Sequence, residues 1–371
     1  MSNETCRIDF ATMERFVFDV FRGMGVPEAD ARICTDVIIT ADKRGISSHG
    51  IGRLKPIYYD RVLKDKIQQP VTNFEVIRDR KATAVVDGHL GMGMVVAKRA
   101  MDMAIAKARD YGMGMVVARN STHYGIAGYW AILPCASGMI GLTGTNARPS
   151  IAPTFGVENM LGTNPLVFGI PTDEPFPFTN DYATSITQRG KVEEYERAGK
   201  TMPAGWVIDH DGKTKTDAAE VLKDLIAGRA ALTPLGGIGE ETAGYKGYGF
   251  ATVVEILSAA LQQGAFLRQL MGIDEHGKKT PYHLGHFFIA IDIESFCDLG
   301  AFKKTTGDIL RELRGSMKAP GAERIYTCGE KEYLYWQKNK DKGIPVDPEL
   351  QKHLVAMRNE LKLTQYRFPF E

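Results

Sequence analysis

The sequence predicts an α/β protein in which helices from both ends of the chain form one domain around an α/β middle. Apolar residues recur at helical spacing in residues 1–75 and again in residues 306–371, whereas residues 76–305 alternate short β-branched runs with helical stretches. A chain of 371 residues also exceeds what one hydrophobic core usually holds, so we expect these ranges to form more than one domain.

The N-terminal range predicts two helices. Asp9 can cap the first helix, which Gly23 and Gly25 would end. Pro27 suits the first turn of a second helix, which reaches the polar segment 42–45. The inner face of this second helix is expected to consist of Ala31, Cys34, Val37, Ile38 and Ala41.

The rest of the chain mixes strands, helices and loops. Short runs rich in Val, Ile and Thr predict strands at 82–86, 114–119, 139–143 and 287–293. An alanine-rich stretch predicts a helix at 95–108, and the segment 250–261 is apolar nearly all round, which predicts a helix buried between layers. Residues 186–245 are rich in charge, Gly and Pro and are expected to form long active-site loops. Asp347 and Pro348 open a final helix.

The composition excludes several classes of protein. A net charge of +1 gives no reason to expect nucleic acid or an anionic membrane surface as a partner, and no apolar run approaches the roughly 20 residues that cross a bilayer. Residues 1–6 show neither the basic start nor the apolar core of a secretory signal. The 5 cysteines lie far apart without a CxxC pair, which favours a reducing compartment. We therefore expect a cytoplasmic protein.

The glycine pattern of the common dinucleotide-binding fold is absent from the sequence. The nearest segment, GHLGMG at 88–93, has the wrong spacing for GxGxxG between a strand and a helix. The segment 44–54 instead combines two arginines, two serines and a histidine with three glycines. Arginine matches a carboxylate with two parallel hydrogen bonds, and histidine exchanges protons near neutral pH. The segment therefore indicates a substrate site, with a polar loop beside a helix as the alternative.

Three further polar segments contain residues that could bind a ligand or a metal. Residues 120–125 (NSTHYG) follow a predicted strand, where α/β proteins place ligands, although a capping hydroxyl beside an incidental histidine would give the same pattern. Residues 244–249 (GYKGYG) open a predicted helix, where free N–H groups and Lys246 suit a pyrophosphate; a surface lysine is the alternative. His283 and His286 lie three apart without an acidic third ligand at typical spacing, so we expect no metal site.

Together these segments resemble the malate/L-lactate dehydrogenase family, also called the sulfolactate dehydrogenase-like family. The resemblance runs from about residue 10 to residue 345. Each short motif is weak by itself, but their common order along the chain is specific. The matching motifs are RGISSHG at 44–50, STHYGIAGY at 121–129, GTNP at 162–165, ATS at 183–185, RGK at 189–191, GYKGYG at 244–249 and LGHFFIAID at 284–292.

The resemblance implies a fold outside the Rossmann class, in which a mixed-sheet cofactor domain joins the helical domain and two copies form a homodimer. It implies that Ser48 and His49 are the acid/base pair, with His123 as the rival. Arg53 would grip the substrate carboxylate, with Arg44 and Thr163 beside the substrate. The residues expected at the nicotinamide cofactor are Thr122, His123, Tyr124, Gly125, Thr179, Asn180, Asp181, Lys246, Gly329 and Glu330.

The expected function is that of an NAD(P)-dependent oxidoreductase that moves a hydride at C2 of a small 2-hydroxy or 2-oxo acid. L-Malate/oxaloacetate and L-lactate/pyruvate are the leading substrates. A reductase of cyclic imino acids, a metal-dependent hydrolase using His283 and His286, and a non-catalytic nucleotide-binding relative are the alternatives. NAD is the expected cofactor, with NADP as the alternative, because Arg189 and Lys191 could meet a 2′-phosphate.

Overall fold

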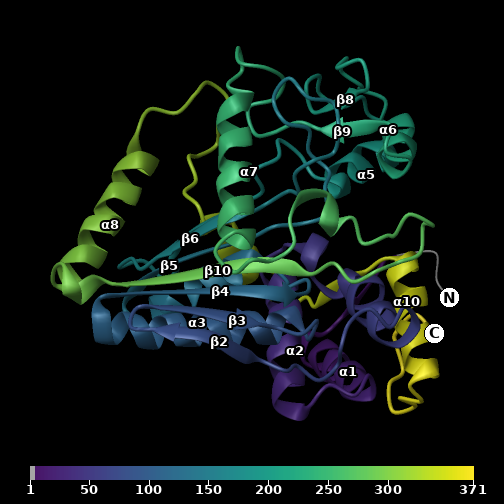
Figure 1. Cartoon of the computed structure of the whole chain (residues 1–371), viewed down its shortest axis with the longest axis horizontal. Coiled ribbons are helices and arrows are strands. Elements are labelled where there is room, and N and C mark those ends of the chain that lie inside the picture. Colours follow the sequence, from purple (N-terminus) through teal and green to yellow (C-terminus); the bar gives the residue numbers. More distant parts are fainter. Residues whose placement is uncertain (1–4) are drawn as a thin grey trace.

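The computed structural model describes residues 5–371, and its centre is a seven-stranded mixed sheet (Figure 1). The strands across the sheet are, in order, β2 (Glu75–Arg80), β3 (Thr83–Asp87), β4 (Met113–Ser121), β10 (Leu284–Asp292), β5 (Met139–Thr145), β6 (Leu166–Ile170) and β7 (Phe178–Tyr182). Among these strands only β3 and β4 are parallel neighbours, and α3 (Gly93–Tyr111) makes the crossover between them. The mixed sheet that the family resemblance implied is confirmed.

The central strand β10 shows that apolar layers cover both faces of the sheet. Phe288 and Ala290 belong to the large core on the side of α3. Phe287 points the other way and packs with Val254 of α7 (Gly244–Ala259). Because successive side chains of a strand face opposite sides, this strand is apolar throughout, as its sequence indicated.

The helix α7 is not buried between layers, so that prediction was wrong. Val254 and Ser258 face the sheet, but Phe250, Val253 and Ile256 are 46%, 47% and 53% exposed. A helix that is apolar on all sides is expected to be buried on all sides. The sequence does not show whether the same chain or a partner molecule buries the outer face. Within residues 5–371 nothing covers the outer face of α7.

The two ends of the chain lie side by side (Figure 1). The strand β1 (Cys6–Ile8) pairs antiparallel with β11 (Ile344–Val346). Next to this pair lie α1 (Phe10–Gly23), α2 (Glu28–Lys43) and α10 (Pro348–Glu360). Asp9 and Asp347 cap α1 and α10 as expected, because their side chains accept the N–H groups of Thr12 and Leu350. The rings of Tyr366 and Phe368 meet Phe16 of α1 edge to face.

The predicted inner face of α2 is confirmed, since Ala31, Cys34, Val37, Ile38 and Ala41 are all buried. α8 (Leu299–Gly315) lies away from α1 and α2, on the side of the sheet that α7 occupies (Figure 1). The domain boundaries at 75/76 and 305/306 stay predictions.

Residues 186–245 form a small lobe in which the expected loops connect two short helices and two short strands that the sequence analysis did not predict. The lobe contains α5 (Arg189–Arg197), β8 (Val207–Asp209), α6 (Ala218–Ile226) and β9 (Ala230–Leu232). Its apolar cluster includes Val192, Val207 and Val221 together with Ile151 and Leu161 from outside the range. The sequence pattern did not reveal these elements because each is short. The helix α5 also has Val192 as its one buried side chain, which leaves almost no apolar periodicity.

Several shorter elements complete the structure. α4 (Ala127–Ile132) covers β5 and β6, and α9 (Glu330–Asn339) follows α8. The turns of 3₁₀ type are η1 (Ser47–His49), η2 (Ile51–Arg53), η4 (Pro134–Ser137), η5 (Leu267–Leu270) and η6 (Ile293–Ser295), and η3 (Leu54–Lys64) is a π-helix.

Candidate active site

A tight turn after α2 carries the first group of predicted site residues. Gly45, at φ 74°, ends the helix, and η1, η2 and the π-helix η3 follow directly. The carboxyl group of Asp42 lies so close beneath Gly50 that no side chain fits at that position. Asp42 Oδ2 also accepts the N–H of Ile51 at 2.8 Å. Burial raises the pKa of Asp42 to about 7. Asp42, which sequence reasoning missed, therefore supports the turn from below.

Ser48 and His49, which the resemblance implied as the acid/base pair, lie next to each other on this turn. Ser48 Oγ lies 3.0 Å from His49 Nδ1, so the two side chains are hydrogen-bonded. Burial, with a smaller effect of the Arg53 charge, lowers the pKa of His49 to about 4. The imidazole is therefore neutral near pH 7 and able to accept a proton. Arg53 donates from Nε to the Ser48 carbonyl oxygen at 2.5 Å, which ties the turn together.

His123 faces the turn from the end of β4. Its ring stacks on His49 with centroids 5.6 Å apart and planes 21° apart. His123 Nδ1 lies 2.6 Å from the Tyr58 hydroxyl and accepts the backbone N–H of Gly125 at 3.2 Å. Burial and the neighbouring charges hold the pKa of His123 well below its usual range. The two histidines that the sequence placed in separate segments thus belong to one site.

A cavity of about 300 Å³ opens beside the two imidazoles. Most predicted site residues line it: Arg44, Ser48, His49, His123, Tyr124, Gly125, Thr163, Thr179 and Asp181. Its lining also includes Thr145, Asn146, Pro165, Gln188, Leu284 and Glu332. Burial lowers the pKa of Arg44, while the charges of Glu332 and Asp181 oppose that shift.

A second hollow of about 680 Å³ adjoins the first and shares Ser48, Asp181, Ala183 and Gln188 with it. Arg53 lines this second hollow and not the first. Arg197 of α5 lines it as well, so the small lobe forms one wall of the site.

The other predicted cofactor residues lie behind or beside the cavity lining. Thr122 is buried, and its hydroxyl donates to Gly91 O and accepts the N–H of Gly93. Asn180 accepts a weak hydrogen bond from Cys328 Sγ at 3.7 Å. Gly329, at φ 90°, begins α9 beside Thr179, and Glu330 is buried against Arg324.

Lys246 is exposed on the first turn of α7 and lines neither hollow. The beginning of α7 packs closely on the backbone of Leu235, and a Cβ at Gly247 would clash with it. Leu235 in turn lines the second hollow. Lys246 is thus one layer removed from the site, and its contact with the cofactor stays a prediction.

His283 and His286 do not face a common ligand. His283 Nδ1 lies 3.0 Å from Asn120 Oδ1. His286 is fully buried, with Nδ1 2.7 Å from Thr145 Oγ1 and Nε2 2.8 Å from Ser121 Oγ. Among residues 5–371 no group of three metal-ligating side chains gathers.

Comparison with known proteins decides the family. Residues 8–355 match the family described as malate/L-lactate dehydrogenase. The chain belongs to this family. It is 43% identical to the malate dehydrogenase of Pyrococcus horikoshii over 331 residues, which cover 89% of each chain. It is 38% identical to the L-sulfolactate dehydrogenase of Methanocaldococcus jannaschii over 352 residues, which cover 94% of this chain and 96% of the relative.

Solved structures agree with this family assignment. The malate dehydrogenase of Entamoeba histolytica is 43% identical, with a TM-score of 0.93 over 99% of this chain and 100% of the other. The prediction of a 2-hydroxy-acid dehydrogenase is confirmed. No helix within residues 5–371 of this dehydrogenase is both long and apolar enough to cross a membrane.

The two hollows of this dehydrogenase suit a polar ligand such as a nicotinamide cofactor. Arg44 Nε, Ser185 Oγ and Thr187 Oγ1 are buried in or beside them and have no hydrogen-bond partner among the described residues. Buried polar atoms without partners are costly, and a bound ligand can satisfy them. The residues therefore fit the cofactor that the family implies.

Sequence reasoning missed Asp42, Tyr58 and Glu332. A signal existed for Asp42, since an acidic residue at the end of an otherwise apolar helix face precedes the RGISSHG motif. Tyr58 and Glu332 gave none, because one lies in an ordinary helical stretch and the other among surface charges.

Proposed function

We propose that this dehydrogenase interconverts L-malate and oxaloacetate with a nicotinamide cofactor. The stacked imidazoles of His49 and His123 beside the Arg44 cavity carry the proposal, because a 2-hydroxy acid needs a proton acceptor and a carboxylate receptor within a few ångströms. Malate has a carboxylate at each end of a short carbon chain. The site offers guanidinium groups in both hollows, with Arg44 in one and Arg53 in the other.

Each reacting group has a separate role in the proposed reaction. A nicotinamide cofactor, when bound beside these residues, would supply the hydride acceptor for C2 in the oxidising direction. His49 takes the proton of the hydroxyl group, since its neutral imidazole is hydrogen-bonded to a hydroxyl, which can donate or accept. Arg53 uses Nε to hold the Ser48 carbonyl, and its terminal nitrogens remain to bind a carboxylate.

We propose NAD as the cofactor. Arg189 and Lys191 were the candidates for a 2′-phosphate, and each forms an ion pair within α5, with Glu193 and Glu194 respectively. A cation that already has a carboxylate partner is a weaker receptor for a phosphate.

A substrate panel tests the proposal. Purified protein is assayed with L-malate, L-lactate, L-sulfolactate and a cyclic imino acid, each with NAD(H) and NADP(H). The proposal expects the highest kcat/KM for L-malate with NAD. Turnover confined to the cyclic imine or to L-lactate would overturn the substrate assignment, and a preference for NADP would overturn the cofactor assignment.

We also propose a homodimer in the cytoplasm. The exposed apolar side chains on α7 continue into a groove lined by Ile256, Phe266 and Leu267, and Phe266 is 49% exposed. A contiguous apolar face of this kind marks an interface, and a second copy of the chain is the occupant proposed for it. The scattered free cysteines support a reducing compartment.

A further inference from the structure

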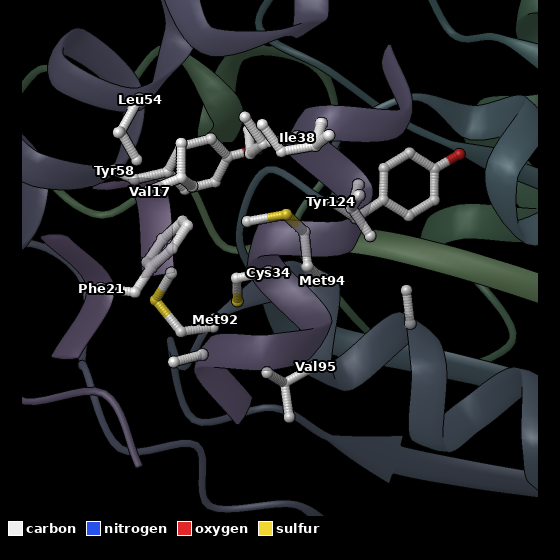
Figure 2. Close-up of a cluster of buried hydrophobic side chains, with 14 of the residues drawn as sticks. Val17, Phe21, Cys34, Ile38, Leu54, Tyr58, Met92, Met94, Val95 and Tyr124 are labelled. Carbon is white, nitrogen blue, oxygen red and sulfur yellow. The ribbon is translucent and has the colours of Figure 1, made fainter. Parts of the chain in front are cut away.

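Tyr58 reaches the active site from the hydrophobic core. It lies in the π-helix η3, directly after the turn that carries His49, and its side chain is fully buried. Figure 2 shows its ring among Val17, Leu54 and Phe21, and the Phe21 ring meets it at a centroid distance of 6.0 Å. A π-helix inserts one extra residue per turn and is often found at functional sites. The ring therefore has little freedom, and its hydroxyl is held at one point.

The hydrogen-bond partner of the Tyr58 hydroxyl is Nδ1 of His123. The Tyr58 oxygen lies 2.6 Å from Nδ1, and the backbone N–H of Gly125 points to the same atom at 3.2 Å. A backbone N–H can only donate a hydrogen bond, so Nδ1 must offer its lone pair to it. If Nδ1 carried a proton, the Tyr58 oxygen would have to accept both that proton and the N–H of Gly125, which also approaches it.

The contact with Gly125 favours the His123 tautomer that carries its proton on Nε2. No group among the described residues hydrogen-bonds to Nε2, and His123 lines the cavity. His49 differs, because its Nδ1 partner is the Ser48 hydroxyl, which can donate or accept. One imidazole can therefore exchange a proton through either nitrogen, and the other cannot without breaking the contact with Gly125.

We infer that Tyr58 is a positioning residue that, together with Gly125, locks His123 as a neutral hydrogen-bond donor, so that His123 polarises the C2 oxygen while His49 alone exchanges the proton. In the reducing direction the Nε2–H of His123 points to the carbonyl oxygen, the hydride goes to C2, and His49 delivers the proton to that oxygen. This inference rests on the proposed function. A neutral imidazole in this role avoids placing a second cation beside His49 and Arg53.

The tautomer can be measured without any assay of activity. The protein is labelled with ¹⁵N at histidine, and two-bond ¹H–¹⁵N correlation spectra are recorded, with the His123 signals assigned by their loss in His123→Gln. We expect an unprotonated Nδ1 and a protonated Nε2 for His123 from pH 6 to pH 8. A protonated Nδ1 in the wild type would overturn the inference.

Kinetics of Tyr58→Phe give the second readout, and the neighbouring Tyr59→Phe is the matched control. Tyr59 has the same side chain on the same π-helix, but its hydroxyl donates to Glu360 at 2.8 Å, away from the histidines. We expect Tyr58→Phe to lower kcat about ten-fold, which corresponds to the loss of one hydrogen bond of ordinary net strength, while KM for the substrate stays near that of the wild type.

The same variant should also show His123 signals shifted toward a mixture of tautomers. Tyr59→Phe should leave both kcat and these signals unchanged. An unchanged kcat in Tyr58→Phe, or an equal loss in both variants, would overturn the positioning role. A wild-type protein that turns over no 2-oxo acid would instead overturn the proposed function, and the tautomer would still be measurable.

Discussion

The two histidines of the site differ in the atoms that surround them more than in their distance from the cavity. His49 has a hydroxyl partner and a neutral ring, whereas His123 has a backbone N–H that fixes its lone pair. Histidine is the side chain whose charge responds most readily to such surroundings near neutral pH. Chemical roles at this site are therefore assigned by neighbours, and a sequence motif alone does not separate them.

His49→Ala should lower kcat by about 10²-fold or more, the usual contribution of general acid–base catalysis. The role proposed for His49 in oxidation requires its unprotonated imidazole, and the pKa of His49 is lowered to about 4. Activity should therefore be retained as the pH falls below 6.5 and be lost only on approach to pH 4.

A profile of kcat/KM for malate oxidation between pH 5 and pH 9 checks this expectation, because kcat/KM reports the free enzyme. A decline centred near pH 6.5 that disappears in His49→Ala would contradict the low pKa. A near-normal kcat in His49→Ala would remove His49 from the role altogether.

The sequence predicted many of the residues that line the cavity. Polar motifs near glycine indicated the segments around His49 and His123, and the family resemblance added Thr179 and Asp181. The sequence could not predict that His123 and His49 would stack, since 73 intervening residues include α3 and β4 and no periodicity relates them. The role of Tyr58 could not be predicted for the same reason. Its hydrogen-bond partner is His123, and the two residues come together only when η3 packs near the end of β4 in the folded chain.

At the scale of elements, the turn after α2 depends on one small residue. Gly50 lies directly over the Asp42 carboxyl group, and Gly52, on the same turn, has no atom nearer than 4.0 Å to where a Cβ would be. Gly50→Ala should therefore displace the turn and lower the free energy of unfolding by about 1–3 kcal/mol, as overpacking usually does. Gly52→Ala should be nearly neutral in stability.

Urea unfolding of both variants, with kcat/KM measured alongside, gives the comparison. Displacement of the turn in Gly50→Ala should also lower kcat/KM, because Ser48 and His49 lie on the same turn. Equal stability of the two variants would show that Asp42 does not support the turn through close packing.

Elements with clear periodicity were predicted well, and two others were not. The capped helices α1 and α10 and the apolar strand β10 agree with expectation, because local patterning and burial coincide there. The small lobe was taken for loops because short elements with charged outer faces give weak periodicity. The exposure of α7 was not predicted because apolar composition does not show which part of the structure, or which partner, buries each face of a helix.

At the scale of the whole molecule, the outer face of α7 should join two copies of the chain. Ile256→Glu places a charge in the middle of this face and should shift the protein toward monomer and lower its stability, since an obligate interface usually buries about 2,000 Å² or more. Met317→Glu is the control, because Met317 is 97% exposed and lies outside α7.

Sedimentation velocity over a concentration series, with activity at each point, provides the measurement. Because α7 packs on the backbone of Leu235 at the second hollow, dissociation should also reduce activity. A wild-type protein that is monomeric and fully active would end the proposal of a homodimer.

The pairing of β1 with β11 has a consequence for biosynthesis. Arg7 donates to the Gly343 carbonyl across 336 positions of sequence, and Phe16 of α1 packs on Tyr366 and Phe368. A ribosome releases the first of these residues long before the last, and domains otherwise tend to fold in the order of synthesis. The helices that carry the His49 turn therefore lack these partners until residues 343–368 have left the exit tunnel. A stalled or truncated nascent chain would present an unpaired strand and an open apolar surface, which is the kind of state that chaperones hold.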